Sequence, residues 1–432
     1  MMKKTISAEA MPVAAPSNAN LTRYIQLALL VLAAGAIYPM LYLRQVYQST
    51  MLEALAINNS ELGYLYSILG TAFLLSYLPS GWLADRLSPR YLISFSLIGT
   101  GALGMWYSTL PGFDTLLVIF CGFGITTGLT FWAALIKRVK MLAGEDEQGR
   151  FFGVLDGGRG LVEALLATIA IALFAYVTET RGEKNAQGLQ LVIHMYAIFC
   201  IVLGAALMLV RDPQKNHREA SVEKGNLLDD FKTLLRIPEL WLVTAIVFCG
   251  YHFFWATYSF SAYLQEGGFG LSATAAGVIT TIKLWMRPVG GIGGGWLGDR
   301  FSKAGVLTVA MLFAALGMIG LIVLPSLHVL GVLIFLVIFI GLMTYAIRGL
   351  YWAVLDDCRI PMRVTGLAIG IISVIGYSPD AYLPLLNGYI TDRFPGFVGY
   401  QIYFSYVVVM GLLGVVATLI LNKRIQKRAK KA

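Results

Sequence analysis

Twelve long apolar runs constrain the fold of this chain more than any other feature of its sequence. Each run is about the length that a helix needs to cross a bilayer, roughly 20 apolar residues, and none alternates in polarity as a barrel strand would. Because the chain is 57% hydrophobic and only 13% charged, a water-soluble fold could not bury it. We therefore predict an all-α membrane protein with twelve transmembrane helices. The runs fall at approximately residues 23–48, 61–84, 91–109, 114–136, 152–177, 190–210, 239–264, 272–297, 304–325, 328–355, 364–390 and 400–422.

A segment that occurs twice indicates that the helices form two similar halves. The sequence GWLADR at residues 81–86 returns as GWLGDR at residues 295–300, and the only long polar stretch, residues 211–238, separates six runs from six. We therefore predict two pseudo-symmetric six-helix bundles. The expected segments are a cytoplasmic N-terminal tail at 1–22, an N-terminal bundle at 23–210, a cytoplasmic linker at 211–238, a C-terminal bundle at 239–422 and a cytoplasmic tail at 423–432.

The distribution of basic residues predicts that both termini are cytoplasmic. Most of the 33 Lys and Arg residues fall in loops on the same side as the N-terminus, whereas the other loops hold only Arg181, Lys184 and Arg393. Cytoplasmic loops of membrane proteins carry such an excess of positive charge. This pattern explains the net charge of +9 without a nucleic-acid partner. We expect a multi-pass protein of the cell inner membrane that contacts the lipid bilayer and works as a monomer.

The repeated segment also carries a family resemblance. Its first copy continues as GWLADRLSPR over residues 81–90, which resembles the loop motif of the major facilitator superfamily of secondary transporters, with Ser88 in place of the usual glycine. The resemblance implies two six-helix halves, alternating access, and a conformational latch that forms when the cytoplasmic side is shut. The latch candidates are Gly81, Asp85, Arg86, Arg90, Gly295, Asp299 and Arg300.

Elementary electrostatics is consistent with a latch at these positions. A carboxylate such as Asp85 or Asp299 at a helix end is stabilised by the positive N-terminal end of a neighbouring helix, and an arginine beside it can bind terminal carbonyl groups. Contacts of this kind can form in one conformation and break in another. The alternative is a simple turn at the membrane surface, where exposed charge costs little.

Basic residues within the predicted spans are candidates for binding a small anion. Lys283 and Arg287 are four residues apart and share a helix face. Arg287 precedes Asp299 by about 18 Å of helix, which places it near the middle of a hydrocarbon core of about 30 Å. Because charge at that depth is costly, two cations there imply an anion. The segment RPVGG at 287–291 resembles the eighth helix of the nitrate/nitrite porters, whose second substrate arginine corresponds to Tyr77 here.

Arg44 and Arg348 are two further candidates for the anion site. The Leu43–Arg44 pair and the later SELG segment at 60–63 resemble the organophosphate antiporters and the anion:cation symporters, which implies a first-helix arginine for an organic anion. The alternative for each arginine is an interfacial side chain that reaches toward the lipid headgroups. His252, in the seventh run, is interpreted as a packed or hydrogen-bonded histidine rather than a proton carrier.

Acidic residues within the spans are candidates for coupling an ion to transport. Asp156, Arg159 and Glu163 place an acid, a base and an acid on one helix face. This triplet is either a fixed neutral pair or a protonation switch whose partner changes with conformation. Asp380, in the eleventh run, is a second proton-carrier candidate.

A second sequence echo places two tryptophans at corresponding levels of the two halves. The segments FWAAL at 131–135 and YWAVL at 351–355 contain Trp132 and Trp352. We interpret these residues as part of an aromatic belt at the membrane interface rather than as a substrate cage.

These observations together predict a secondary transporter for a small organic anion. The site is expected near the bilayer midplane between the halves, with coupling to a proton or exchange for a counter-anion. The four cysteines and four histidines lack metal-ligand spacing, and no nucleophile–base pair or cofactor motif appears, so we expect no enzyme activity, metal or cofactor. Two alternatives stay open: a transporter-fold sensor without net transport, and efflux of a different small solute.

Overall fold

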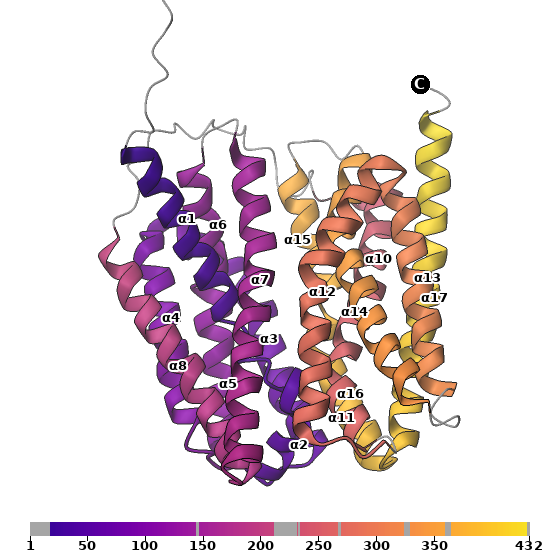
Figure 1. Ribbon diagram of the computed structural model, residues 1–432. Helices are drawn as coiled ribbons and strands as arrows, with labels where there is room; N and C mark the ends of the chain where they lie inside the picture. The colour runs from indigo at the N-terminus through magenta and orange to yellow at the C-terminus, as the bar shows by residue number, and fades with distance from the viewer. Residues whose placement is uncertain are drawn as a thin grey trace, which may run out of the picture.

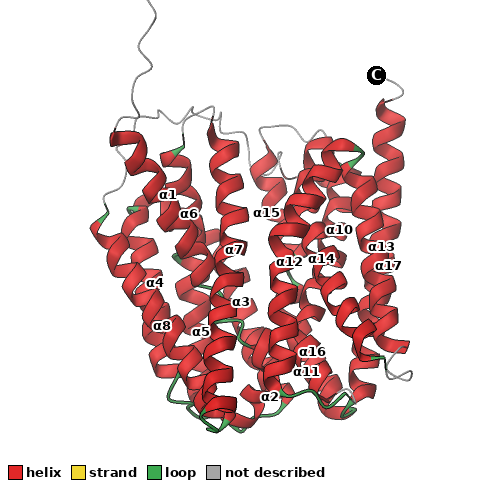
Figure 2. Cartoon of the chain, in the orientation of Figure 1, coloured by secondary structure: helices red, strands yellow, loops and turns green. Residues whose placement is uncertain are grey.

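The computed structural model describes residues 18–143, 147–210, 231, 234–266, 269–323, 329–358 and 364–429. All regular secondary structure in these residues is helical (Figure 2). Most of the predicted linker 211–238, and part of each predicted tail, lie outside the described residues.

The first six predicted runs are all helical. Pro39 lies in a break of the first run, where its missing N–H group cannot continue a helix. Two π-helical turns, η1 (Ile125–Leu129) and η3 (Tyr176–Thr180), follow α5 and α7. The helices are α1 (Asn18–Ala36), α2 (Arg44–Leu55), α3 (Asn59–Arg86), α4 (Pro89–Tyr107), α5 (Phe113–Gly124), α6 (Trp132–Leu142), α7 (Gln148–Ala175) and α8 (Asn185–Leu209).

The last six predicted runs are helical as well, and two of them are broken. The seventh run is interrupted by the 3₁₀ turn η4 (Thr257–Ser259), and the eleventh is interrupted before Pro379, which begins a new helix. The elements are α10 (Pro238–Ala256), α11 (Phe260–Glu266), α12 (Ala273–Arg300), α13 (Lys303–Val323), α14 (Leu330–Ala353), η6 (Val354–Cys358), α15 (Thr365–Gly376), α16 (Pro379–Arg393) and α17 (Phe397–Ala429).

The predicted class, an all-α membrane protein, is confirmed, and each predicted run contains a helix. By length and hydropathy, eight helical segments among the described residues can cross a membrane, or nine if α3, which bends by 57° near Pro79, counts as one span. Large apolar side chains such as Leu75, Val202 and Phe335 are exposed on the outer surface. Lipid rather than water suits a surface of this kind.

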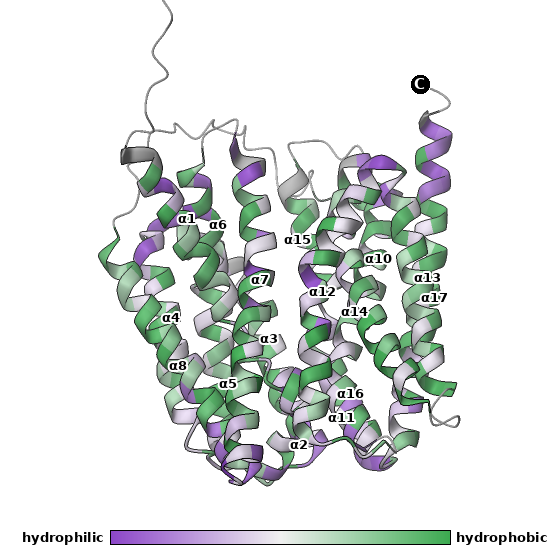
Figure 3. Ribbon diagram, in the orientation of Figure 1, coloured by the Kyte–Doolittle hydropathy of each residue, from purple (hydrophilic) through white to green (hydrophobic). Residues whose placement is uncertain are grey.

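The helices form two groups that stand side by side. Figure 1 shows α1 to α8 in one group and α10 to α17 in the other. α1 begins and α17 ends on one face, which we call the terminal face, whereas α2 and α11 lie toward the opposite face, the far face. Figure 3 shows apolar residues over most of the helix length, and polar residues toward the helix ends and along parts of α7 and α12.

Glycines allow the two groups to approach closely where α3 packs against α16. A Cβ atom added at Gly63 would lie 2.9 Å from the Cα of Leu385, and one added at Gly388 would lie 2.9 Å from the Cα of Ser60. Both separations are shorter than ordinary van der Waals contact, so only glycine fits. Small residues permit the same close packing of backbones between membrane helices in general.

Hydrogen bonds join the two groups near the far face. The carboxylate of Asp392, at the end of α16, accepts bonds from the backbone N–H of Asn59 (3.1 Å), from its side-chain amide (3.1 Å) and from the N–H of Ser60 (2.7 Å). An acid of one group therefore caps the positive N-terminal end of α3 in the other. Ser49 also donates to Glu266 (2.9 Å), and Ser261 donates to the carbonyl of Val46 (2.6 Å).

We expect Asp392→Ala to destabilise this junction by roughly 1–3 kcal/mol, because it leaves the donors at the start of α3 without their acceptor. Thermal unfolding of the detergent-purified protein measures the effect as a lower melting temperature. Asp392→Asn keeps one acceptor oxygen and should melt between the wild type and the alanine variant. Glu53→Ala, at an exposed position of α2, is the control. Equal melting temperatures for Asp392→Ala and the wild type would contradict the role given to this carboxylate.

Candidate functional site

A cavity of about 750 Å³ lies between the two groups of helices. On α7 its lining runs from Gly153 to Glu163, and on α12 from Arg287 to Ile292, so it occupies the parts of these helices nearer the terminal face. Six of the eight residues predicted to bind substrate or to couple an ion line it. They are Asp156, Arg159 and Glu163 of α7, Arg287 of α12, Arg348 of α14 and Asp380 of α16.

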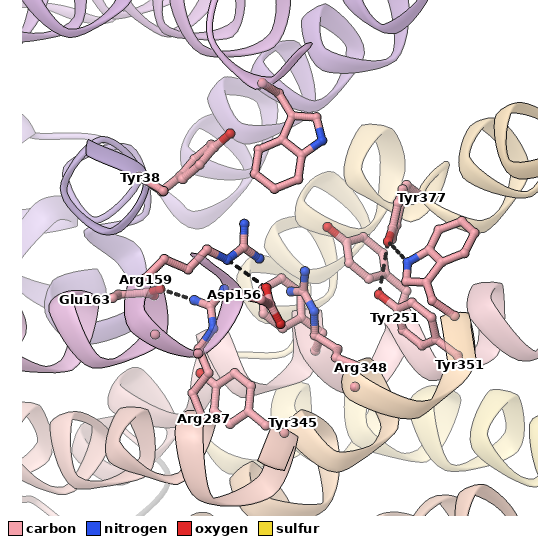
Figure 4. Close-up of a pocket in the computed structure, with 18 of the residues that line it drawn as sticks. Tyr38, Asp156, Arg159, Glu163, Tyr251, Arg287, Tyr345, Arg348, Tyr351 and Tyr377 are labelled. Atoms are coloured by element: carbon pink, nitrogen blue, oxygen red, sulfur yellow. Dashed lines mark hydrogen bonds and ion pairs between the residues drawn. The ribbon is translucent and has the colours of Figure 1, made fainter. Parts of the chain in front are cut away.

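The acid–base–acid triplet of α7 divides its contacts between two partners. Arg159 pairs with Asp156 through an N–O distance of 3.1 Å, and its guanidinium also lies 5.1 Å from the ring centroid of Trp132. Glu163 instead accepts from Arg287 of α12 (Figure 4). The triplet is therefore one pair within α7 and one acid that pairs with the neighbouring helix of the other group.

Arg287 joins the two groups of helices through contacts with α7 and α14. Besides its ion pair with Glu163, its guanidinium lies 5.9 Å from the ring centroid of Tyr345. Gly160 makes room for it, since an added Cβ would stand 3.2 Å from the Arg287 side chain. Trp285, half a turn earlier on α12, donates to the hydroxyl of Thr168 on α7 at 3.0 Å. The Arg287 guanidinium and the Glu163 carboxylate therefore neutralise each other in this conformation.

Arg348 differs from the other two arginines of the cavity because it has no carboxylate beside it. Among the described residues it has no hydrogen-bond or ion-pair partner, and its guanidinium rests 4.0 Å from the ring centroid of Phe254 and 5.7 Å from that of Tyr251. Aromatic faces attract a cation but leave its N–H groups available. The guanidinium thus presents donors to the cavity (Figure 4).

Asp380 is the third acid of the cavity, and neutral donors hold it. Its Oδ1 accepts from the hydroxyl of Tyr251 at 2.8 Å and from the indole N–H of Trp255 at 2.7 Å. The residue is buried and lies at the start of α16, in the close contact with Gly70 of α3. No basic side chain of the described residues comes within ion-pair distance of this carboxylate, so neutral hydrogen-bond donors are its partners.

Aromatic side chains form most of the remaining wall. The hydroxyls of Tyr351 and Tyr377 lie 3.1 Å apart, and the indole N–H of Trp352 donates to Tyr377 at 3.0 Å. Trp132 lines the cavity too, so the interpretation of both tryptophans as an interfacial belt is wrong. The sequence analysis overlooked the tyrosines, although Tyr38 with Tyr42, and Tyr251 with Tyr258, recur at helical spacing. The tyrosines of the wall are Tyr38, Tyr42, Tyr251, Tyr258, Tyr345, Tyr351 and Tyr377.

Two predicted anion ligands, Lys283 and Arg44, lie outside this cavity. Lys283 is fully buried against Gly341 of α14, and its ammonium lies 3.4 Å from the carbonyl of Thr257. Arg44 is 1% exposed and donates from Nε to the side chain of Gln48 at 3.1 Å. The alternative that Arg44 reaches the lipid headgroups is wrong, because protein surrounds it.

His252 has the hydrogen-bonded environment that the sequence analysis favoured. Its Nδ1 lies 2.7 Å from the carbonyl of Phe248, and its Nε2 lies 3.1 Å and 3.0 Å from the hydroxyls of Tyr406 and Tyr382. It does not line the cavity. In the part of the chain that the structure describes, no group of three or more His, Cys, Asp or Glu side chains is placed to hold a metal ion.

The latch candidates lie near the terminal face and contact residues of their own group of helices. Asp85 is 79% exposed and lies 3.6 Å from the ammonium of Lys137 on α6. Arg86 and Arg90 stack on Trp82 and Tyr91, at 4.2 Å and 4.5 Å from the ring centroids.

The second copy of the motif behaves similarly. Arg300 stacks on Trp296 at 5.7 Å, and Asp299 is exposed. Added Cβ atoms at Gly81 and Gly295 would meet no neighbour, so packing in this conformation does not require glycine at either position. A latch between the two halves stays a prediction for another conformation.

An all-helical membrane protein with a charged cavity between two groups of helices is the class that this geometry defines. Residues 24–384 match the family model of the Major Facilitator Superfamily. The chain therefore belongs to the Major Facilitator Superfamily.

Individual proteins extend this likeness over nearly the whole chain. The chain is 30% identical over 390 residues to the inner membrane protein YqcE of Escherichia coli strain K12, covering 88% of this chain and 90% of YqcE. It is 26% identical over 423 residues to the probable galactarate/D-glucarate transporter GudP of Bacillus subtilis strain 168, covering 86% and 88%. A solved bacterial homolog of the human lysosomal transporter Spinster, in an inward-facing and unoccupied conformation, has a TM-score of 0.76 at 16% identity, covering 94% and 98%. The last comparison supports the fold alone.

Lys283 is a predicted anion ligand that the structure buries outside the cavity, so its substitution tests that placement. If the cavity binds a small anion, as the sequence predicts, Lys283→Met should leave that binding unchanged, because the Lys283 side chain is buried outside the cavity. Equilibrium binding of a radiolabelled organic anion to the purified protein measures this. Loss of binding in Lys283→Met, with an unchanged melting temperature, would indicate that Lys283 is an anion ligand, as the sequence predicts.

Proposed function

We propose that the protein is a secondary transporter that carries a small organic anion across the inner membrane by alternating access. The observation that carries the proposal is Arg348: a guanidinium without a carboxylate partner among the described residues, facing a central cavity. In a low-dielectric surrounding, an uncompensated cation favours a bound anion, and a guanidinium matches a carboxylate with two parallel hydrogen bonds.

The rest of the wall favours a substrate that carries hydroxyl groups. Seven tyrosines and two tryptophans present hydroxyl and indole N–H groups beside apolar ring faces. Such groups bond to the hydroxyls of a substrate and stack against its carbon backbone. The similarity to a protein named as a probable galactarate/D-glucarate transporter supports the same class, a hydroxylated carboxylate.

The conformation supports a transport cycle in which the terminal face opens to the cytoplasm. The cavity lies toward the terminal face, while Asp392 and Glu266 take part in bonds between the halves at the far face. The excess of basic residues in the loops on the N-terminal side supports a cytoplasmic position for the terminal face. In the opposite state, Asp85 and Asp299 would form the cytoplasmic latch, and the bonds of Asp392 would break.

A coupling ion completes the proposal. Asp380 is the acid of the cavity without an arginine at ion-pair distance among the described residues, so it is the side chain that we expect to bind and release a proton during transport. The alternative is anion exchange, in which a counter-anion replaces the substrate at Arg348.

Removal of the Arg348 guanidinium tests the anion site. We expect Arg348→Ala to reduce uptake of an organic anion into proteoliposomes by roughly 10- to 100-fold, the factor that corresponds to a hydrogen bond with a charged group. Arg348→Lys keeps the charge but loses the paired donors and should fall between. Arg181→Ala, in an exposed pair with Glu183, is the control.

The assay needs equal amounts of inserted protein, checked by blotting, and a separate binding measurement. Uptake by Arg348→Ala at the wild-type rate would rule out the anion site. Binding without any uptake or counterflow in the wild type would instead support the transporter-fold sensor.

A further inference from the structure

The charges that line the cavity come in pairs, with one arginine left over. Among the described residues, three arginines and three acids line the cavity. Asp156 neutralises Arg159, and Glu163 neutralises Arg287. The third acid, Asp380, bonds to neutral donors, so Arg348 is the cation whose donors face the cavity without a bonded protein acid.

We propose that the cavity selects a hydroxylated anion with one negative charge over one with two. This inference rests on the proposed function and narrows its substrate class. A single carboxylate satisfies Arg348, while a second carboxylate on the same molecule would find no other unpaired guanidinium among the described residues that line the cavity. Burial of an unpaired charge is costly in a low-dielectric site, so the dianion pays a penalty that the monoanion avoids.

Asp380 adds repulsion to the missing attraction. It lines the α16 side of the cavity, and its Oδ1 bonds to the neutral donors of Tyr251 and Trp255 rather than to an arginine. An ionised Asp380 disfavours a second carboxylate in the cavity, whereas the hydroxyl groups of a substrate meet donors and acceptors on Tyr258 and Tyr345.

The same argument covers other anions. A carboxylate or a sulfonate carries one charge at neutral pH, whereas a phosphate ester carries nearly two. The pattern of pairs thus disfavours phosphate esters and dicarboxylates alike, and it leaves aldonates and similar hydroxylated monoacids as the matching class.

One substitution should change this selectivity in a known direction. Glu163→Gln removes the acid that neutralises Arg287 and leaves a second guanidinium in the cavity. A dianion gains a partner from this change, but a monoanion already bound at Arg348 gains little. The variant is therefore expected to bind dianions better than the wild type does, a gain that a merely disruptive mutation would not give.

Gluconate and glucarate test the inference, because they share a six-carbon hydroxylated chain and differ in having one or two carboxylates. Binding of radiolabelled gluconate to the purified full-length protein is competed with unlabelled gluconate or glucarate. We expect gluconate to compete about tenfold better in the wild type, and Glu163→Gln to bring glucarate about tenfold closer. Glu183→Gln, at a partly exposed residue that pairs with Arg181 and does not line the cavity, should keep the wild-type ratio.

Each outcome separates this inference from the proposed function. If glucarate binds the wild type as well as gluconate does, the inference fails while an anion transporter stands. An unchanged ratio in a folded Glu163→Gln protein would also overturn it, because the pairing would then not set the selectivity. If neither compound binds the wild type, the hydroxylated-carboxylate function itself fails. The wild-type ratio decides the matter even if Glu163→Gln does not fold.

Discussion

The cost of charge inside a membrane is the constraint on which the rest of this structure depends. In a membrane-spanning protein, a carboxylate, a set of acceptors or a ligand stabilises a guanidinium that has little contact with water. Arg159 and Arg287 find Asp156 and Glu163, and in doing so Arg287 ties the two groups of helices together. Arg348 rests on aromatic rings instead and faces the cavity. The proposed site follows from this difference, since the partner that Arg348 lacks among the described residues is one that a substrate can supply.

The packing of the helices leaves a cavity toward the terminal face and closes the molecule toward the far face. Glycines of α3 and α16 bring the two groups into close contact, and Asp392 caps the start of α3 near the far face. Broken helices such as α15 and α16 bring side chains from their interrupted ends to the middle of the molecule, where Asp380 lies beside Tyr251. In transporters generally, irregular backbone at this depth is tolerated where it lines a cavity or is buried in protein. The same rule explains why an acid can stand at the start of α16.

Much of the fold could be predicted from the sequence, because runs of about 20 apolar residues and a repeated loop motif are local features. That Arg287 lies within a long helix is a local feature too, but its partner could not be predicted: Glu163 lies 124 positions away, and only tertiary packing brings the two together. Lys283 shares a nominal helix face with Arg287 yet turns toward Gly341, since a spacing of four residues leaves the direction of a long side chain open. Trp132 and Trp352 were predicted to lie at the membrane interface but line the cavity. The sequence could not separate these positions, because tryptophan is common both at membrane interfaces and in binding sites.

An experimental structure of the protein with bound gluconate tests the central claim most directly, because it shows which guanidinium holds the anion. The account predicts the carboxylate within hydrogen-bond distance of the Arg348 guanidinium, the substrate hydroxyls against the tyrosines of the cavity, and the pairs Asp156–Arg159 and Glu163–Arg287 still in place. Gluconate bound elsewhere, or an Arg348 side chain paired with a protein carboxylate while the cavity stays empty, would contradict it.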